Sequence, residues 1–269
     1  MSTRKNWLGL FLFAAVGCQG TVPAPQSKTH RPVAAPPAAS STQRPELESP
    51  PRSLPGAARP FPNVTTATLA NGLALDVIER RKIPVVELSL VVASGHAKDG
   101  DHPGVARTTA LLLEAGGAGR WSSEKLREAV DALGSSLEVT STRDSMRWSL
   151  AVTSDKVREA LELLSALALK PRFDPLEFKK LRARELERVQ SLAKTSGTWL
   201  AQYWLHRELY RQAMGIHPYA SVDVLPSEIN RLTLDDCRRF HQLHVVPSNA
   251  RVVAVGDIDL GTLTSLTDG

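Results

Sequence analysis

The pattern of predicted helices and strands in this chain is centred on one segment, Val105-Ala106-Arg107-Thr108-Thr109-Ala110-Leu111-Leu112-Leu113-Glu114-Ala115. It is rich in apolar residues and ends at the pair Gly116-Gly117. Its alanine and leucine content favours a buried helix. A polar, glycine-rich loop from Gly95 to Gly104 precedes it. We therefore expect a buried helix over residues 105–115, and the elements on either side of it decide the class of fold.

Two stretches of alternating apolar residues come before this helix. They are Leu73, Leu75 and Val77, which follow the turn signal Asn71-Gly72, and then Val86, Leu88, Leu90 and Val92. A period of two predicts two strands.

A longer series of elements follows the central helix. The pattern predicts a helix that begins at Ser122 or Ser123 and stops at Gly134, strands at 137–139 and 146–152, helices at 157–168, from 175 past 189 and at 199–210, and a buried strand at 251–256. The ten residues from Leu260 to Gly269 show no clear helix. Strand pair, helix pair, strand pair, helices and a last strand together predict an α+β domain.

The N-terminus has the features of an exported protein. A basic start, Met1 to Asn6, precedes an uncharged apolar run from Trp7 to Val16, which is shorter than the roughly 20 residues that a membrane-spanning helix needs. We predict a signal peptide over residues 1–17. The sequence Ala15-Val16-Gly17-Cys18 resembles a bacterial lipobox, which implies cleavage before Cys18 and lipid on its sulfur. An ordinary cleaved signal with an incidental cysteine is the alternative.

The residue after Cys18 is Gln19 rather than Asp, which implies an outer-membrane lipoprotein that faces the periplasm. Residues 18–60 are rich in Pro, Ala and Ser and lack a core-forming period, so we expect a lipid-anchored tether. The folded domain is predicted over residues 61–269.

Charge and cysteine content exclude two classes of protein. The net charge is +5 over 269 residues, and the Lys and Arg residues are interspersed with Asp and Glu, which is typical of solvated helix faces rather than a nucleic-acid surface. The two cysteines, Cys18 and Cys237, lie in regions with different fates, so we expect no disulfide framework. We expect Cys237 to be a partly buried free thiol on a helix.

Six short motifs follow one another in the order of a known family. They are Leu69-Ala70-Asn71-Gly72-Leu73, His102-Pro103-Gly104-Val105-Ala106, Phe173-Asp174-Pro175-Leu176-Glu177-Phe178, His217-Pro218-Tyr219, Val246-Pro247-Ser248-Asn249-Ala250 and Val255-Gly256-Asp257-Ile258-Asp259. The set resembles the insulinase, pitrilysin and mitochondrial processing peptidase family. The resemblance implies a mixed, largely antiparallel sheet with helices packed on one side, as in the single-domain unit of that family.

The same resemblance implies a zinc site that this sequence does not preserve. Active members carry H-x-x-E-H, with two zinc-binding histidines and a general-base glutamate, on the helix after P-G-[LV]-A. The five matching positions here are Arg107-Thr108-Thr109-Ala110-Leu111, and neither H-x-x-E-H nor H-E-x-x-H occurs elsewhere in the chain. The third ligand of the family, a glutamate, would fall near Glu187. We predict no catalytic residue, no metal ligand and no cofactor, and lipidation of Cys18 as the one functional site.

The remaining histidines and aromatic residues have structural interpretations. His241 and His244 have helical metal-site spacing but lack a nearby base, so we interpret them as structural or surface residues, with metal binding as the alternative. His96 and His102 flank the loop and are expected to be solvated, whereas His206 is expected to be packed or at an interface. Four aromatic residues at near-helical spacing, Trp199, Tyr203, Trp204 and Tyr210, are expected in the core, with a stripe that faces a partner as the alternative.

Three functional hypotheses follow. Members of the family are clamshells of two halves, of which one is often degenerate and helps to hold the peptide. The leading hypothesis is therefore a non-catalytic lipoprotein that binds peptide as the hetero-oligomeric partner of a zinc-binding family member. A zinc endopeptidase with displaced ligands is the second. The third is an envelope-surface binding module or a truncated remnant, because a second domain follows V-G-D-[IV]-D in the family and this sequence stops soon after Asp259.

Overall fold

The computed structural model describes residues 62–267 except 213–214, 218 and 220–223. The predicted signal peptide, Cys18 and the predicted tether lie outside the described residues, so these assignments and the domain limits stay predictions. Within the described part of the chain, every helix is too short or too polar to cross a membrane.

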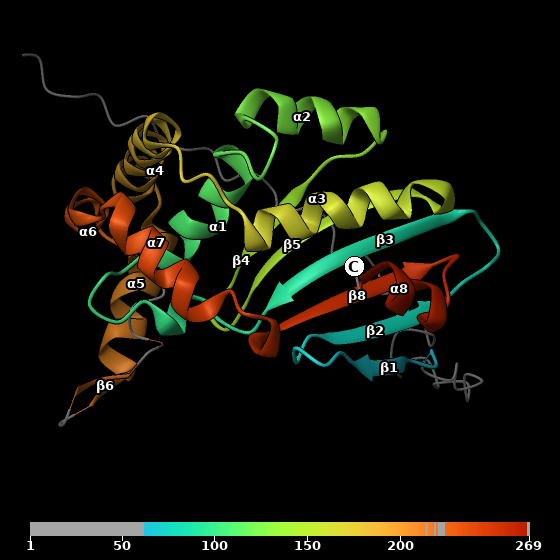
Figure 1. Cartoon of the computed structure of the whole chain (residues 1–269). Coiled ribbons are helices and arrows are strands. Elements are labelled where there is room, and N and C mark those ends of the chain that lie inside the picture. The colour runs from blue at the N-terminus through green and yellow to red at the C-terminus, as the bar shows by residue number, and fades with distance from the viewer. Residues whose placement is uncertain (1–61, 213–214, 218, 220–223, 268–269) are drawn as a thin grey trace, which may run out of the picture. The chain divides into compact units, whose positions relative to one another are not determined.

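Strands and helices alternate along the chain much as the sequence predicts (Figure 1). The strands are β1 (Thr65–Thr68), β2 (Ala74–Glu79), β3 (Val85–Val92), β4 (Glu138–Ser141), β5 (Met146–Thr153), β6 (Arg211–Gln212), β7 (Gly215–Ile216) and β8 (Ala250–Gly256). The helices are α1 (Val105–Ala115), α2 (Ser123–Ala132), α3 (Val157–Leu169), α4 (Pro175–Thr195), α5 (Gly197–Leu209), α6 (Pro226–Arg231), α7 (Leu234–His244) and α8 (Leu260–Thr267). The central helix is confirmed with its predicted limits, residues 105–115.

One six-stranded sheet organises the domain. Its strand order is β1-β2-β8-β3-β5-β4. Only the β2–β8 pair is parallel among these strands, and the other neighbours are antiparallel. The mixed, largely antiparallel sheet that the family resemblance implies is therefore confirmed. The C-terminal strand β8 lies in the middle of the sheet, between two strands from the start of the domain.

The core lies between the sheet and the helices that cover it. Alternate residues of β3, from Val86 to Val92, are almost completely buried, whereas Glu87 between them is exposed. Helices α1, α3 and α8 contact the strands, and α3 also contacts both α1 and α8. Since a sheet would separate helices on opposite faces, these three lie on the same face (Figure 1). Helices α4 and α7 pack against α1 in turn.

The end of the described chain differs from the prediction, because residues 260–267 form the helix α8. The Asp259 carboxylate accepts the backbone N–H of Thr262 at 2.8 Å, as an N-terminal cap does. Leu263 is fully buried, and Leu260 and Leu266 pack against the same core. Leucines three residues apart on one helix face explain why this polar-looking segment folds onto the sheet.

The aromatic residues of α5 differ in burial. Tyr203 is buried, as expected for the core, and stacks on Trp199 with ring centroids 5.8 Å apart. Trp204, by contrast, is 59% exposed, so the core interpretation is wrong for this residue. Neighbours in sequence lie about 100° apart around a helix, and only one side of α5 faces the domain.

Candidate functional site

The N-terminus of α1 is held in place by a buried carboxylate. Asp99 is 3% exposed and accepts the backbone N–H groups of Gly104 at 2.7 Å and Ala106 at 2.9 Å. These amides have no partner within the helix, so an anion there satisfies them and interacts favourably with the helix dipole. Gly104 has a φ of +89°, which glycine adopts without strain. This arrangement fixes the direction in which α1 presents Arg107.

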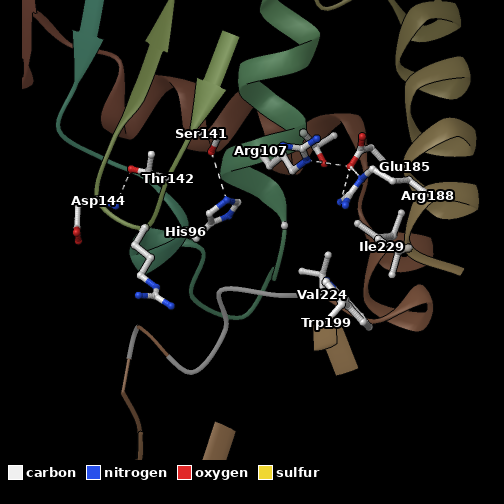
Figure 2. Close-up of a pocket in the computed structure, with 14 residues that line it drawn as sticks. His96, Arg107, Ser141, Thr142, Asp144, Glu185, Arg188, Trp199, Val224 and Ile229 are labelled. Carbon is white, nitrogen blue, oxygen red and sulfur yellow. Dashed lines mark hydrogen bonds and ion pairs between the residues drawn. The ribbon is translucent and has the colours of Figure 1, made fainter. Parts of the chain in front are cut away.

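Arg107 on α1 faces a buried carboxylate on α4. Its Nε donates to Glu185 Oε2 at 2.9 Å, and Arg188 Nε donates to the same oxygen at 3.0 Å (Figure 2). The Glu185 side chain is only 9% exposed, whereas those of Arg107 and Arg188 are 34% and 39% exposed. One buried carboxylate is thus shared by two half-exposed guanidinium groups.

The two arginines keep Glu185 ionised. Burial by itself raises the pKa of Glu185, because it penalises the charged carboxylate, but the hydrogen bonds and charges of Arg107 and Arg188 outweigh it. The pKa of Glu185 therefore lies below the usual value for glutamate. In this cluster, the guanidinium groups of Arg107 and Arg188 compensate the negative charge of the buried Glu185 carboxylate.

Two other positions of the lost zinc motif point into the packed core. Ala110 is fully buried, and its carbonyl oxygen accepts a hydrogen bond from Trp148 Nε1 at 3.1 Å. Leu111 is partly buried and packs against the core. Neither side chain carries an atom that can bind a metal or take up a proton.

The glutamate opposite α1 is Glu185, two residues before Glu187, near which the family resemblance placed the third ligand. Glu187 is exposed. The buried residues of α4 are Phe178, Leu181, Glu185 and Val189. Their spacing of three and four residues is a helical stripe, and Glu185 falls in it. The helical spacing of these four residues is the sequence signal that could have identified Glu185 as the buried glutamate.

The zinc ion that the family resemblance implies does not fit these residues. A catalytic zinc needs three protein ligands, drawn from His, Cys, Asp and Glu. Arg107 and Leu111 offer no lone pair, and Glu185 is already engaged by two guanidinium groups. Within the described residues, no cluster of three or more His, Cys, Asp or Glu side chains could hold a metal ion.

A cavity of about 520 Å³ opens beside the Arg107–Glu185–Arg188 cluster. It is lined by residues of α1, α4, the end of β4 and the loop that joins β4 to β5 (Figure 2). Trp199, Val224 and Ile229 form an apolar part of the wall. Because β4 stands last in the strand order of the described sheet, it is an edge strand there. The cavity thus lies next to an edge strand and has both charged and apolar walls.

The loop between β4 and β5 brings a third arginine to the cavity. Arg143 Nη2 lies 2.8 Å from His206 Nε2 on α5, and its guanidinium lies over the Tyr219 ring at 5.6 Å. The Tyr219 hydroxyl donates to both oxygens of Asp144 at 2.8 Å, and this hydrogen bond raises the pKa of Tyr219. The expectation that His206 is packed is confirmed.

His96 is buried rather than solvated as the sequence predicted, because its backbone pairs with the β4–β5 loop. The residue is 8% exposed, and its N–H donates to Thr142 O at 3.0 Å. Its ring reaches the cavity, with Nε2 3.5 Å from Ser141 Oγ. His102, in contrast, keeps a side chain that is 45% exposed.

His241 and His244 on α7 bind different partners, which confirms their structural interpretation. His241 Nε2 lies 2.7 Å from Ala168 O, and His244 Nδ1 lies 3.2 Å from Ser94 Oγ. Burial lowers the pKa of both rings. On the same helix, Cys237 is a fully buried free thiol, and burial raises its pKa to about 12. Such a thiol is a core residue rather than a nucleophile.

Comparison with known structures shows what this domain resembles. An inactive domain of a peptidase M16 from Pseudomonas fluorescens is 28% identical, with a TM-score of 0.70 over 76% of this chain and 49% of that one. A protease from Helicobacter pylori is 21% identical, with a TM-score of 0.69 over 77% of this chain and 49% of that one. The periplasmic protease PqqL from Escherichia coli is 18% identical, with a TM-score of 0.62 over 77% of this chain and 24% of that one.

The chain therefore spans about half the length of the first two of these proteins. None of the curated proteins compared with it matches. A sequence model of the insulinase family, peptidase family M16, matches residues 77–221, which include α1, the β4–β5 loop and α4. With the family's fold present as well, the chain belongs to the insulinase family of peptidases, family M16.

Proposed function

We propose that this chain is a non-catalytic member of the insulinase family that binds extended peptides as the partner of a zinc-bearing family member. The observation that carries the proposal is the hydrogen bond between Arg107 and Glu185. It joins the two helices between which the family holds its zinc, and together with the hydrogen bond from Arg188 it occupies Oε2 of Glu185. A domain of similar fold, 28% identical, is itself described as inactive.

The geometry beside this ion pair supports peptide binding. The edge strand β4 ends at Ser141, which lines the cavity. An exposed sheet edge offers unpaired N–H and C=O groups to which an extended peptide can add as another strand. A peptide bound there would run along the cavity wall, and its side chains would reach Arg107 and Trp199.

The proposal includes the lipid anchor on Cys18 and a place on the periplasmic face of the outer membrane. These features rest on the sequence of residues 1–19. A zinc endopeptidase with displaced ligands is not supported by a specific observation, because no cluster of three or more His, Cys, Asp or Glu side chains among the described residues could hold the metal. The alternative of a binding module that acts without a partner would use the same cavity. It differs from the leading proposal only in that the chain would not assemble with a zinc-bearing family member.

The test is affinity purification of the tagged full-length chain from its own membranes, followed by mass spectrometry and by zinc and peptidase assays. We expect a family member with an intact H-x-x-E-H to copurify in a fixed ratio, and peptide hydrolysis to require that partner. Hydrolysis by the isolated, zinc-loaded chain would falsify the non-catalytic role. Reproducible purification without such a partner would contradict the hetero-oligomer and favour a binding module that acts alone.

A further inference from the structure

The cavity beside Arg107 carries more positive than negative charge. Arginines reach it from three elements, Arg107 from α1, Arg188 from α4 and Arg143 from the β4–β5 loop. Two carboxylates, Glu185 and Asp144, line it as well. Three cations and two anions leave one positive charge, and a cavity wall of protein strengthens its effect on a bound anion.

Both carboxylates of the cavity are already engaged. Asp144 accepts the Tyr219 hydroxyl with both of its oxygens, at 2.8 Å each. Glu185 accepts from Arg107 and Arg188 through one oxygen. These bonds occupy only part of what the arginines can donate, because a guanidinium group carries five N–H donors.

Several donors in the cavity have no acceptor among the described residues. Arg107 is hydrogen-bonded only through Nε there. Arg143 Nε is buried without a hydrogen-bond partner in the described part of the chain. Buried donors without acceptors are costly, so an acceptor that entered the cavity would gain their hydrogen bonds.

We propose that this cavity binds a carboxylate group of the peptide, held by Arg107 and Arg188, which meet at Glu185, while Arg143 adds positive charge to the cavity wall. Planar guanidinium groups match a carboxylate with paired N–H donors, which gives both charge and geometric specificity. The carboxylate is either an Asp or Glu side chain or the C-terminus of the peptide. The inference rests on the proposed peptide-binding function, which it narrows to acidic peptides.

The experiment measures binding of labelled peptides to the purified full chain by fluorescence anisotropy at low salt. Two peptides of one sequence differ only in a central Glu or Gln, and each is made with a free and an amidated C-terminus. We expect the carboxylate-bearing form to bind about tenfold more tightly than its uncharged form. Loss on Glu-to-Gln exchange assigns a side chain, and loss on amidation assigns the C-terminus. The preference should shrink at high salt.

Substitutions of single arginines test whether the preference for carboxylate-bearing peptides arises in this cavity. Arg188→Gln removes one donor group from the cavity, and Arg120→Gln removes the same charge from an exposed ion pair with Glu162 on another surface. We expect the preference to fall at least severalfold in the first and to remain in the second. Arg188→Lys keeps a charge beside Glu185 without the planar donor pair, so it should also lose preference while it folds normally.

Three outcomes distinguish failure of the carboxylate pocket from failure of the proposed peptide-binding function. Peptides that bind equally well with and without a carboxylate would overturn the carboxylate pocket and leave the peptide-binding function standing. A preference that survives both Arg188 variants would place the anion elsewhere and would also overturn the pocket. Failure of every peptide to bind would contradict the proposed function itself.

Discussion

Trp148 Nε1 on β5 donates a hydrogen bond to the carbonyl oxygen of Ala110 on α1, over 3.1 Å. Both side chains are fully buried. This contact ties the helix of the lost zinc motif to the centre of the sheet. Together with the packing of α1 against α4 and α7, it holds this helix in position.

The first prediction concerns this contact. Trp148→Phe removes the donor and leaves space in the core, so we expect a loss of about 1–3 kcal/mol in the free energy of unfolding. Urea unfolding followed by circular dichroism measures it. Trp204→Phe, at a position that is 59% exposed, is the matched control and should change the stability little. Equal effects of both substitutions would contradict a structural role of the Trp148–Ala110 bond.

The second prediction concerns the pH dependence of stability. The folded-state pKa of Glu185 lies below its ordinary value. Its ionised form therefore stabilises the fold above the unfolded-state pKa, about 4.3, and this contribution disappears as the pH falls through the folded-state pKa. Arg107→Gln removes a group that lowers this pKa. We expect the variant to be less stable at pH 6, and to lose less additional stability than the original chain between pH 6 and pH 3.

Urea midpoints at several pH values between 3 and 6 test this prediction. Arg120→Gln is the control, because its partner Glu162 is half exposed and such surface pairs contribute little. The control should follow the original chain at every pH. A parallel pH profile for Arg107→Gln would show that Arg107 does not stabilise the ionised form of Glu185.

The third prediction concerns metal binding. Arg107→His alone offers one imidazole and one carboxylate, which is one ligand fewer than a catalytic zinc requires. We expect no stoichiometric zinc after dialysis. The double variant Arg107→His, Leu111→His places two imidazoles one helical turn apart on the helix that packs against α4 and Glu185, so we expect it to retain zinc. It should not hydrolyse peptides, because Ala110 supplies no general base.

Elemental analysis of the dialysed variants and a fluorogenic peptide assay give the two readouts. Zinc in the single variant at a one-to-one ratio would mean that ligands from elsewhere complete the site. No zinc in the double variant, if it folds, would show that α1 and α4 lie at a different spacing from that of a metal site.

The fourth prediction concerns the start of α1. Gly104 and Gly134 both have positive φ, +89° and +69°. An added Cβ at Gly104 would lie 3.1 Å from Val224 Cγ1, whereas one at Gly134 would have nothing within 4 Å. Both alanine variants should lose about 1 kcal/mol or more from backbone strain. Gly104→Ala should lose more, because Val224 must move. Equal thermal midpoints for the two variants would contradict this difference.

The sequence by itself determined the class of fold and the residue types at the positions of the family's zinc motif. Strand and helix periods set the order of elements, because burial on one face imposes a period of two or of about 3.6 residues on the chain. The ordered motifs indicated the family, and Arg107, Ala110 and Leu111 indicated the missing chemistry, because ligand ability depends on residue type alone. The sequence pattern did not predict helix α8, because its few leucines stabilise the helix only when they pack against the sheet.

Only the tertiary structure decided which residues meet. Glu185 rather than Glu187 faces Arg107, because the packing of α4 against α1 selects the buried face of the helix. Likewise, the structure buries His96 and brings Arg143 from a distant loop to the same cavity as Arg188. These contacts join residues that are far apart in the chain, and local sequence patterns contain no information about such distances. The sequence specifies which residue types are available, whereas the packing of the helices determines which of them come together in the site.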